Sequence, residues 1–335
     1  MSTWKRRAVS IPAVLGAAFA AVALSPLAIV AAAIYDLVRG KRRLPSVRIY
    51  LFCLQYLVND GLEIVAAPWY WVVAGFGTRL TSARSIARHE RLQAWSISVL
   101  ARRAESLLGL VIECDSSVEA TLIPGRAILI CRHVSAFDAS LPSLLCQRVG
   151  LRSRGVIMAE MLADPGFDLL YARTGSVFIA RDNGPEALAR VASLGRDLDR
   201  YTAAIIFPEG RLFRPELRDR LLERLATTNP DRHKRLAGLR HVLPPRPGGL
   251  SAMLEAAPDA DVVVIAHEGL DGVASIRALA AAIPLETRWT VTAWRAPRSE
   301  IPTDVDGQAK WLDEQWCRID AWIDQRRTAT TTLGR

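Results

Sequence analysis

The stretch CRHVSAFD, from Cys131 to Asp138, follows an apolar run and places a histidine five residues before an aspartate. The chain contains only 5 histidines. A carboxylate that hydrogen-bonds one imidazole nitrogen orients the ring and leaves the other nitrogen able to take up a proton, which makes a general base. A surface ion pair, or an aspartate that only caps a helix, would explain the same two residues without a catalytic role. The strands and helices around the pair must decide between these interpretations.

Short apolar runs alternate with helical stretches from about residue 108 onward. This alternation predicts an α/β domain with a mainly buried mixed sheet flanked by helices. The stretch NGPEALARVASLGRDLDR has a proline near its first turn and an apolar helical period, which is typical of a crossover helix. The expected strands are LGLVIEC, RAILIC, RGVIMA, GSVFIA, AAIIF, DVVVIA and RWTVTAW.

Three of these expected strands end in residues suited to catalysis or binding. His133 leaves RAILIC, Arg181 follows GSVFIA, and Glu209 follows AAIIF. On one continuous helix His133 and Asp138 would diverge by about 140°, so the chain must bend between them. We expect Ser135 or Asp138 to cap the helix that enters ASLPSLLCQ. Open α/β sheets place their sites at the carboxyl ends of strands, so the three ends together predict one site.

The order of these blocks resembles the glycerolipid acyltransferases, the family of 1-acyl-glycerol-3-phosphate acyltransferase. A fourth block, HVLPPRPGG, looks most like the lysocardiolipin and lysophosphatidylinositol acyltransferase branch, as does the later WLDEQWCRIDAWI. The resemblance covers roughly residues 105 to 250. One departure is that Arg211 and Leu212 follow the third block, where the family usually has threonine and often arginine. The matching residues are His133 and Asp138, then Gly175, Phe178 and Arg181, then Phe207, Pro208, Glu209 and Gly210, with Pro244 and Arg246 in the fourth block.

The resemblance implies transfer of a fatty acyl group from acyl-CoA or acyl-carrier protein to the free hydroxyl of a lysophospholipid. The first expectation is 1-acyl-glycerol-3-phosphate, giving phosphatidic acid, and the alternatives are lysocardiolipin and lysophosphatidylinositol. His133 and Asp138 would form the general base pair, and the second and third blocks would bind the acceptor, with Arg181 clamping its phosphate. Neither a metal nor a bound cofactor is expected, and nucleic acid is not an expected partner.

The N-terminal part of the chain predicts a membrane element, over residues 1–80, before an acyltransferase domain over 81–335 with a helical C-terminal region at about 303–327. Residues 8 to 35 carry no charge, which exceeds the roughly 20 residues needed to cross a bilayer. A second segment, from about 49 to 76, carries Asn59, Asp60 and Glu63 at mid-length and a Trp69-Tyr70-Trp71 cluster. These positions favour an interfacial helix over a free-standing span.

Basic residues flank both segments on every side. Because positive flanks prefer the cytoplasm, we expect a hairpin that dips into one leaflet, with the active site on the cytoplasmic face of the cell membrane. Two full spans are the alternative. The net charge of +9 suits an anionic surface, and 5 cysteines without a paired spacing fit a reducing compartment.

Two other functions fit parts of the pattern. A lipid hydrolase would use Ser135 or another serine as nucleophile, although no G-x-S-x-G elbow is present. A membrane-tethered binding module would leave His133 and Asp138 with structural roles only.

Overall fold

The computed structural model describes residues 2–180, 184–196, 198–271, 273, 276–285 and 288–333. The chain forms two compact units, each built from three segments. The first comprises Met1–Val111, Ile157–Asp182 and Ile276–Arg288, and the second comprises Ile112–Val156, Asn183–Ser275 and Trp289–Arg335. The predicted boundary at residue 80 stays a prediction.

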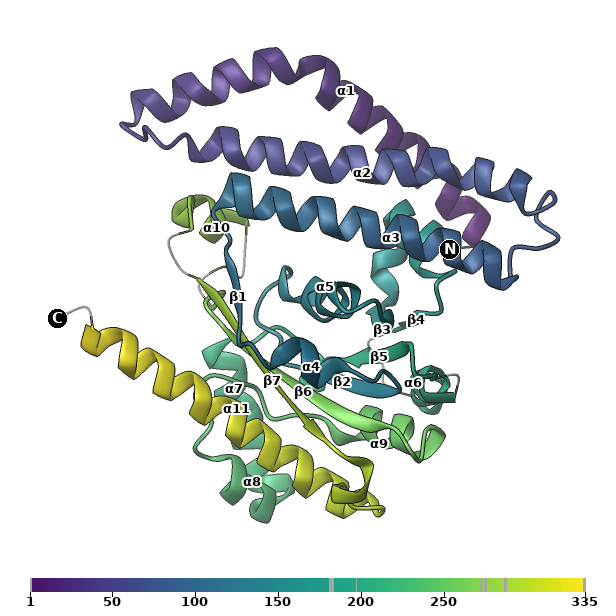
Figure 1. The fold of residues 1–335 in the computed structure, drawn as a ribbon. Coiled ribbons are helices and arrows are strands. Elements are labelled where there is room, and N and C mark those ends of the chain that lie inside the picture. Colours follow the sequence, from purple (N-terminus) through teal and green to yellow (C-terminus); the bar gives the residue numbers. More distant parts are fainter. Residues whose placement is uncertain are drawn as a thin grey trace. The chain divides into compact units, whose positions relative to one another are not determined.

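The first unit begins with a helical hairpin, α1 (Thr3–Val38) and α2 (Pro45–Val73), whose helices run antiparallel (Figure 1). Both are long and apolar enough to cross a membrane. The turn between them is fixed by Asp36, which is buried and accepts hydrogen bonds from the backbone N–H and the hydroxyl of Ser46, both at 2.8 Å. The unit continues with α3 (Ala83–Arg103), η1 (Ala104–Leu108), η3 (Ala159–Ala163), η4 (Phe167–Tyr171), β4 (Val177–Ile179) and α10 (Ile276–Ala282).

Helix α2 is fixed along its length by polar contacts with other parts of the first unit. Near its start, Arg48 donates to the Leu107 carbonyl at 3.1 Å. At mid-length, the Asn59 amide donates to the Ser96 hydroxyl of α3 at 3.1 Å. The second contact satisfies Asn59, a buried polar residue that a lipid-facing helix could not tolerate.

The N-terminus of α1 is also held within this unit. Asp168, which is buried, accepts from Arg7 at 2.9 Å and lies 3.0 Å from Arg6. The basic start of the chain is therefore tied to the segment that separates β3 from β4.

The second unit is built on a mixed sheet in which six strands lie in the order β1-β7-β6-β2-β5-β3. The pairs are parallel except β6 with β7. Every residue of β2 and β5 is buried, as expected for central strands with covered faces. The bounds are β1 (Ile112–Cys114), β2 (Ala127–Cys131), β3 (Arg152–Met158), β5 (Thr202–Ile206), β6 (Asp261–Glu268) and β7 (Trp289–Ala296), with the last two residues of β3 in the first unit.

Helices cover both faces of this sheet. Figure 1 shows α4 and α5 on one side and α7, α8, α9 and α11 on the other. The predicted mixed sheet flanked by helices is confirmed, and all seven apolar stretches contain a strand. The helices are α4 (Val118–Leu122), η2 (Asp138–Ser140), α5 (Leu141–Arg148), α6 (Pro185–Arg196), α7 (Pro215–Thr228), α8 (Pro230–Leu236), α9 (Pro247–Ala256), η5 (Arg298–Glu300) and α11 (Val305–Leu333).

Candidate active site

His133 and Asp138 meet where the chain leaves the carboxyl end of β2. The His133 Nδ1 lies 2.5 Å from the Asp138 Oδ1. The Asp138 side chain is completely buried, whereas that of His133 is 20% exposed. A buried carboxylate therefore holds one nitrogen of a ring that solvent reaches, and Nε2 is the nitrogen left to take a proton from a substrate.

The expected helix cap at this turn is wrong. The second Asp138 oxygen accepts from the backbone N–H groups of Val134, at 2.6 Å, and Ser135, at 2.9 Å. Both donors precede Asp138, so its carboxylate points back into the loop and does not cap the following helix. The residue at the start of α5 is Ser140, which makes no capping hydrogen bond. The carboxylate instead holds together the loop that presents His133.

Ser135 does not offer a free nucleophile. Its side chain is buried, and its hydroxyl donates to the Val273 carbonyl at 3.1 Å while accepting from the Phe137 N–H at 3.3 Å. Both the proton and a lone pair are thus engaged. A serine that serves as a nucleophile needs its hydroxyl directed at a base and at the substrate.

The third block, Phe207 to Gly210, lies beside the histidine at the carboxyl end of β5. The Phe207 ring lies against the imidazole of His133, with centroids 4.6 Å apart and planes tilted by 37°. Gly210 closes the turn with φ +63°, a left-handed conformation that favours glycine. Its N–H donates to the Phe207 carbonyl at 2.9 Å.

Glu209 connects this turn to the two neighbouring blocks. One of its oxygens accepts from the His133 N–H and the other from the Leu243 N–H, both at 3.3 Å. The residue is only 2% exposed. Burial raises the pKa of the Glu209 carboxyl to about 8. Its carboxylate is therefore directed inward, at backbone groups that set the position of His133.

Arg132 belongs to this site although the motifs did not indicate it. Its side chain is completely buried, which is rare for arginine. It donates to the His241 carbonyl at 3.1 and 2.7 Å and to the His267 carbonyl at 2.8 Å, and it makes two further bonds to the Asp271 carboxylate. These contacts use all five N–H groups of a guanidinium.

The signal for Arg132 was present in the quoted stretch, because a charged residue directly after a fully apolar strand must find partners or reach solvent. Its ion pair also sets the charge of Asp271. Burial would raise the pKa of the Asp271 carboxyl, but the guanidinium groups of Arg132 and Arg327 hold this pKa below its usual value. Arg132 thereby joins the end of β2 to the end of β6 and to the fourth block.

A second histidine lies beneath the pair. His267 is completely buried, and its Nε2 lies 3.1 Å from the Arg132 carbonyl oxygen and 3.6 Å from the second oxygen of Asp138. Burial lowers the pKa of His267 to about 4. This ring is therefore neutral near pH 7, and it supports the loop without competing with His133 for a proton.

The remaining predicted residues divide between the two units. In the second unit, the Arg246 N–H donates to the Pro208 carbonyl at 2.9 Å, and Pro244 is buried nearby in the sequence. Gly175, with φ +88°, and Phe178, in β4, belong to the first unit. Arg181 lies outside the described residues.

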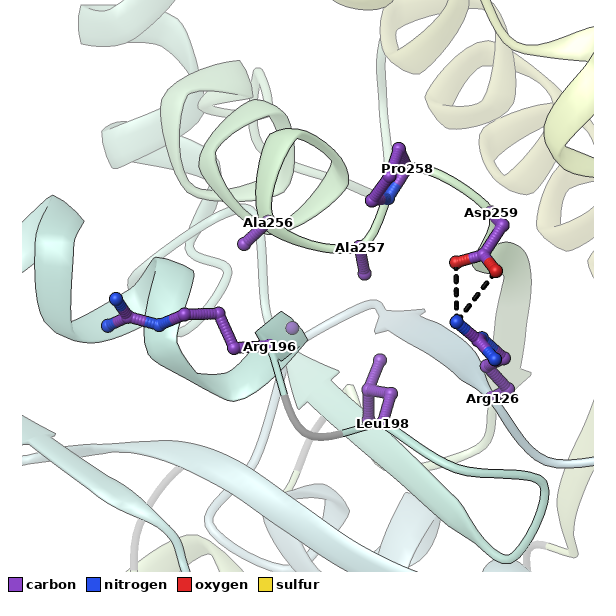
Figure 2. A pocket seen from close by; sticks show the side chains of 8 residues that line it. Arg126, Arg196, Leu198, Ala256, Ala257, Pro258 and Asp259 are labelled. Atoms are coloured by element: carbon purple, nitrogen blue, oxygen red, sulfur yellow. Dashed lines mark hydrogen bonds and ion pairs between the residues drawn. The ribbon is translucent and has the colours of Figure 1, made fainter.

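A pocket at the opposite end of β2 is not part of this site. It has a volume of about 370 Å³ and lies around Arg126, which precedes β2, and Asp259, which precedes β6. Figure 2 shows these two side chains paired at its edge, with N–O distances of 2.8 and 2.6 Å. Because the full length of β2 lies between Arg126 and His133, we assign this pocket no part in the chemistry. Within the described part of the chain, no group of three histidine, cysteine or acidic side chains is arranged to hold a metal ion.

The comparisons with known proteins agree with this geometry. Residues 116–268 match the family model described as Acyltransferase. The chain carries an acyltransferase domain. The domain spans all the residues named above from His133 to Arg246, and it confirms the acyltransferase family predicted from the motifs. The branch within that family stays a prediction.

A solved structure shares the fold of this acyltransferase. It is the 1-acyl-sn-glycerophosphate acyltransferase PlsC from Thermotoga maritima, which superposes with a TM-score of 0.51 at 14% identity. The match covers 84% of this chain and 98% of the other. No curated protein matches the sequence. At this identity the likeness establishes the fold, and the acceptor must be argued separately.

Proposed function

We propose that this acyltransferase moves a fatty acyl group from acyl-CoA or acyl-carrier protein to the free hydroxyl of a lysophospholipid. Our first choice of acceptor is 1-acyl-glycerol-3-phosphate, which would give phosphatidic acid. The observation that carries the proposal is the buried Asp138 held against a solvent-accessible His133 within the acyltransferase domain. The acceptor in the name of the T. maritima enzyme, 1-acyl-sn-glycerophosphate, supports the choice.

The chemistry requires one base and no protein nucleophile. His133 Nε2 takes the proton of the acceptor hydroxyl while that oxygen attacks the thioester carbonyl, and the tetrahedral intermediate then expels the thiolate. The imidazolium returns its proton to the departing sulfur, so the ester and the free thiol are the products. Asp138 holds the ring and stabilises its charged form. General base assistance of this kind contributes about 10²–10⁴-fold.

The acceptor-binding roles of the second block remain those that the motif resemblance implies. Gly175, Phe178 and Arg181 would bind the acceptor from the second block, with Arg181 clamping phosphate. In the third block, Glu209 supports the site through the backbone of His133, because both its oxygens face inward. We propose no metal and no bound cofactor for this reaction.

The membrane element is proposed to lie in one leaflet. Support comes from α3, which bonds α2 at two places: Ser96 accepts from the Asn59 amide at 3.1 Å, and Arg103 donates to the Gln55 amide oxygen at 3.2 Å. This side of α2 therefore has a polar neighbour where a spanning helix would have lipid. Meanwhile α1 exposes a long apolar surface. Its exposed side chains include Val9, Phe19, Val22, Leu24, Leu27, Val30 and Ile34. The hairpin thus offers lipid the apolar side chains of α1, while α3 covers the polar side of α2.

The test is a lysolipid panel with the full chain in membranes. Membranes that contain the wild-type chain are given acyl-CoA or acyl-carrier protein with each lysophospholipid, and products are read by mass. Diacyl product formed from 1-acyl-glycerol-3-phosphate, and lost in His133→Ala, is the expected result. Release of free fatty acid without diacyl product would instead establish a hydrolase, and no thioester consumption with any acceptor would leave a binding module.

A further inference from the structure

His267 directs one of its nitrogens at the catalytic pair. The residue lies in β6, which pairs with β2, and its side chain is completely buried. Its Nε2 faces two oxygens, the Arg132 carbonyl at 3.1 Å and the second Asp138 oxygen at 3.6 Å. A carbonyl and an ionised carboxylate can only accept, so Nε2 carries the ring proton. The dipole of this N–H is therefore directed at Asp138.

The other side of the His267 ring lies in an apolar environment. Its Nδ1 is buried and has no hydrogen-bond partner among the described residues. The ring packs edge-on against the indole of Trp289, with centroids 5.6 Å apart and planes at 85°. Burial lowers the pKa of His267 to about 4, because the opposing charge of Asp138, the charge of Arg132 and the opposing charge of Asp271 have smaller effects. A neutral ring suits this position, since a protonated Nδ1 would be a buried donor without an acceptor.

His267 reaches Asp138 from outside the loop that this carboxylate closes. The backbone N–H groups of Val134 and Ser135, which also point at Asp138, belong to the loop itself. A contact from β6 instead ties the carboxylate to the sheet. The position of Asp138 therefore depends on a second strand as well as on its own loop.

The other ionisable groups around Asp138 do not supply a compensating positive charge. Cys131 and Glu209 are near enough for the charge of Asp138 to act on them. Burial raises the pKa of the Cys131 thiol well above its usual value and that of the Glu209 carboxyl to about 8, so both are mainly uncharged near pH 7. The guanidinium of Arg132 is directed at other acceptors. The N–H dipole from β6 thus acts on a carboxylate whose buried neighbours are mainly neutral.

We propose that His267 is a positioning residue of acyl transfer, whose neutral ring directs its Nε2–H at Asp138, stabilises the carboxylate and keeps the His133–Asp138 pair from taking up a proton before the substrate is bound. A donor that stabilises a carboxylate makes it harder to protonate. The pair takes up this proton as one unit, whichever of its two members holds it. With His267 in place, the pair therefore remains a base at lower pH. This role rests on the acyl transfer proposed above.

The test is the pH dependence of kcat/KM for 1-acyl-glycerol-3-phosphate, measured with the full chain in detergent micelles. His267→Phe keeps a planar ring without the N–H, and it should move the acidic limb of the profile to higher pH by about half a unit. His267→Gln keeps a donor near the position of Nε2, so its limb should stay close to that of the wild type. His267→Leu is a second variant without the donor and should shift the limb as His267→Phe does. A melting curve on each preparation shows that it is folded.

A matched control separates this effect from a general loss of the buried network. The ring of His241 faces Asp324, at 3.2 Å, and Arg327, at 3.1 Å, and the residue reaches Arg132 through its backbone carbonyl. His241→Phe should therefore leave the acidic limb in place. The inference is overturned if the His267 variants lower the rate by the same factor at every pH without moving the limb. A limb that moves equally in His241→Phe overturns it as well.

Chemical modification separates this inference from the proposed reaction. Diethyl pyrocarbonate modifies unprotonated imidazole, so the pH dependence of His133 modification, read by peptide mass, follows the same proton without a lysolipid. His267→Phe should move this dependence to higher pH, while modification of His233, on α8, should not change. A shift without any acyl transfer supports the role of His267 and counts against the proposed reaction. Acyl transfer without a shift in either measurement overturns the role of His267 alone.

Discussion

At the scale of single residues, the site depends on how little freedom His133 has. Its ring is held by Asp138, its N–H by Glu209, and its carbonyl accepts from the Phe213 N–H at 2.8 Å. A base positioned by three separate contacts loses little entropy when the substrate arrives. The same arrangement means that truncating the side chain leaves the backbone contacts in place.

We predict that His133→Ala lowers acyl transfer at least about a hundredfold, because it removes the base. Folding should be retained, since the ring is partly exposed and both backbone bonds survive. Initial rates with 1-acyl-glycerol-3-phosphate and a melting curve on the same preparation test both statements. Retention of more than about a tenth of the wild-type rate would refute the base role.

Arg132→Lys should destabilise the buried hydrogen-bond network that supports the His133 loop. A lysine has three donors on one nitrogen and cannot serve two carbonyls and a bidentate carboxylate at once. We expect a loss of about 2–4 kcal/mol in the free energy of unfolding, measured by denaturant titration. Arg218→Lys is the control, because Arg218 forms its ion pair with the exposed Asp219. Equal and small effects in the two variants would show that the buried network contributes little.

At the scale of elements, the turn after β5 carries a buried carboxyl group that connects two neighbouring segments of the chain. Glu209 accepts hydrogen bonds from the end of β2 and from the fourth block, and its pKa of about 8 lies well above that of an unfolded glutamate. The folded state then holds a proton that the unfolded state releases above about pH 4.3. The contribution of Glu209 to the free energy of unfolding is therefore greatest at low pH, and it falls as the pH rises toward 8.

Glu209→Gln should remove that dependence. Between about pH 5 and pH 8, the wild-type chain should lose stability relative to the variant, although glutamine lacks one acceptor and should be less stable at the acidic end. Melting temperatures of the two proteins measured across this range provide the check. Parallel curves would mean that Glu209 does not titrate there.

The elements themselves were largely predictable, and the side-chain directions were not. The apolar runs within RAILIC and DVVVIA indicated central strands, and β2 and β6 lie at the centre of the sheet. The turn after β2 followed from the angle between His133 and Asp138. The direction of the Asp138 carboxylate could not be predicted, because an aspartate can either cap a helix or close a loop. Contacts distant in the sequence decide between the two. The role of Arg132 was unpredictable for the same reason, because its hydrogen-bond partners are more than a hundred residues away in the sequence.

At the scale of the whole molecule, the orientation of the hairpin in the bilayer can be tested at its turn. Residues 41–43 are exposed, whereas Ser46 is engaged by Asp36, so Arg42→Cys is the better probe. Cys53, Cys114 and Cys317 are first replaced, and the buried Cys131 and Cys146 are kept. If the hairpin lies in the cytoplasmic leaflet, an impermeant thiol reagent should label the introduced thiol only after the cells are opened.

Labelling of intact cells would instead establish two full spans. Thr227→Cys is the control, because Thr227 is exposed on α7 and a thiol there should follow the accessibility of the catalytic domain. If both positions are labelled only in opened cells, the turn and the domain face the same compartment.

The interleaving of the two units has a consequence for making this protein. Neither unit is a continuous stretch, because three segments of one alternate with three of the other. On the ribosome, the hairpin must wait for residues 276–288 to emerge before its unit is complete. A version cut at residue 80 in search of a soluble enzyme would keep α3 but lose α2, the helix that buries the Ser96 side of α3. Such a truncation should aggregate through that uncovered face, so detergent extraction of the full chain is the better route to active material.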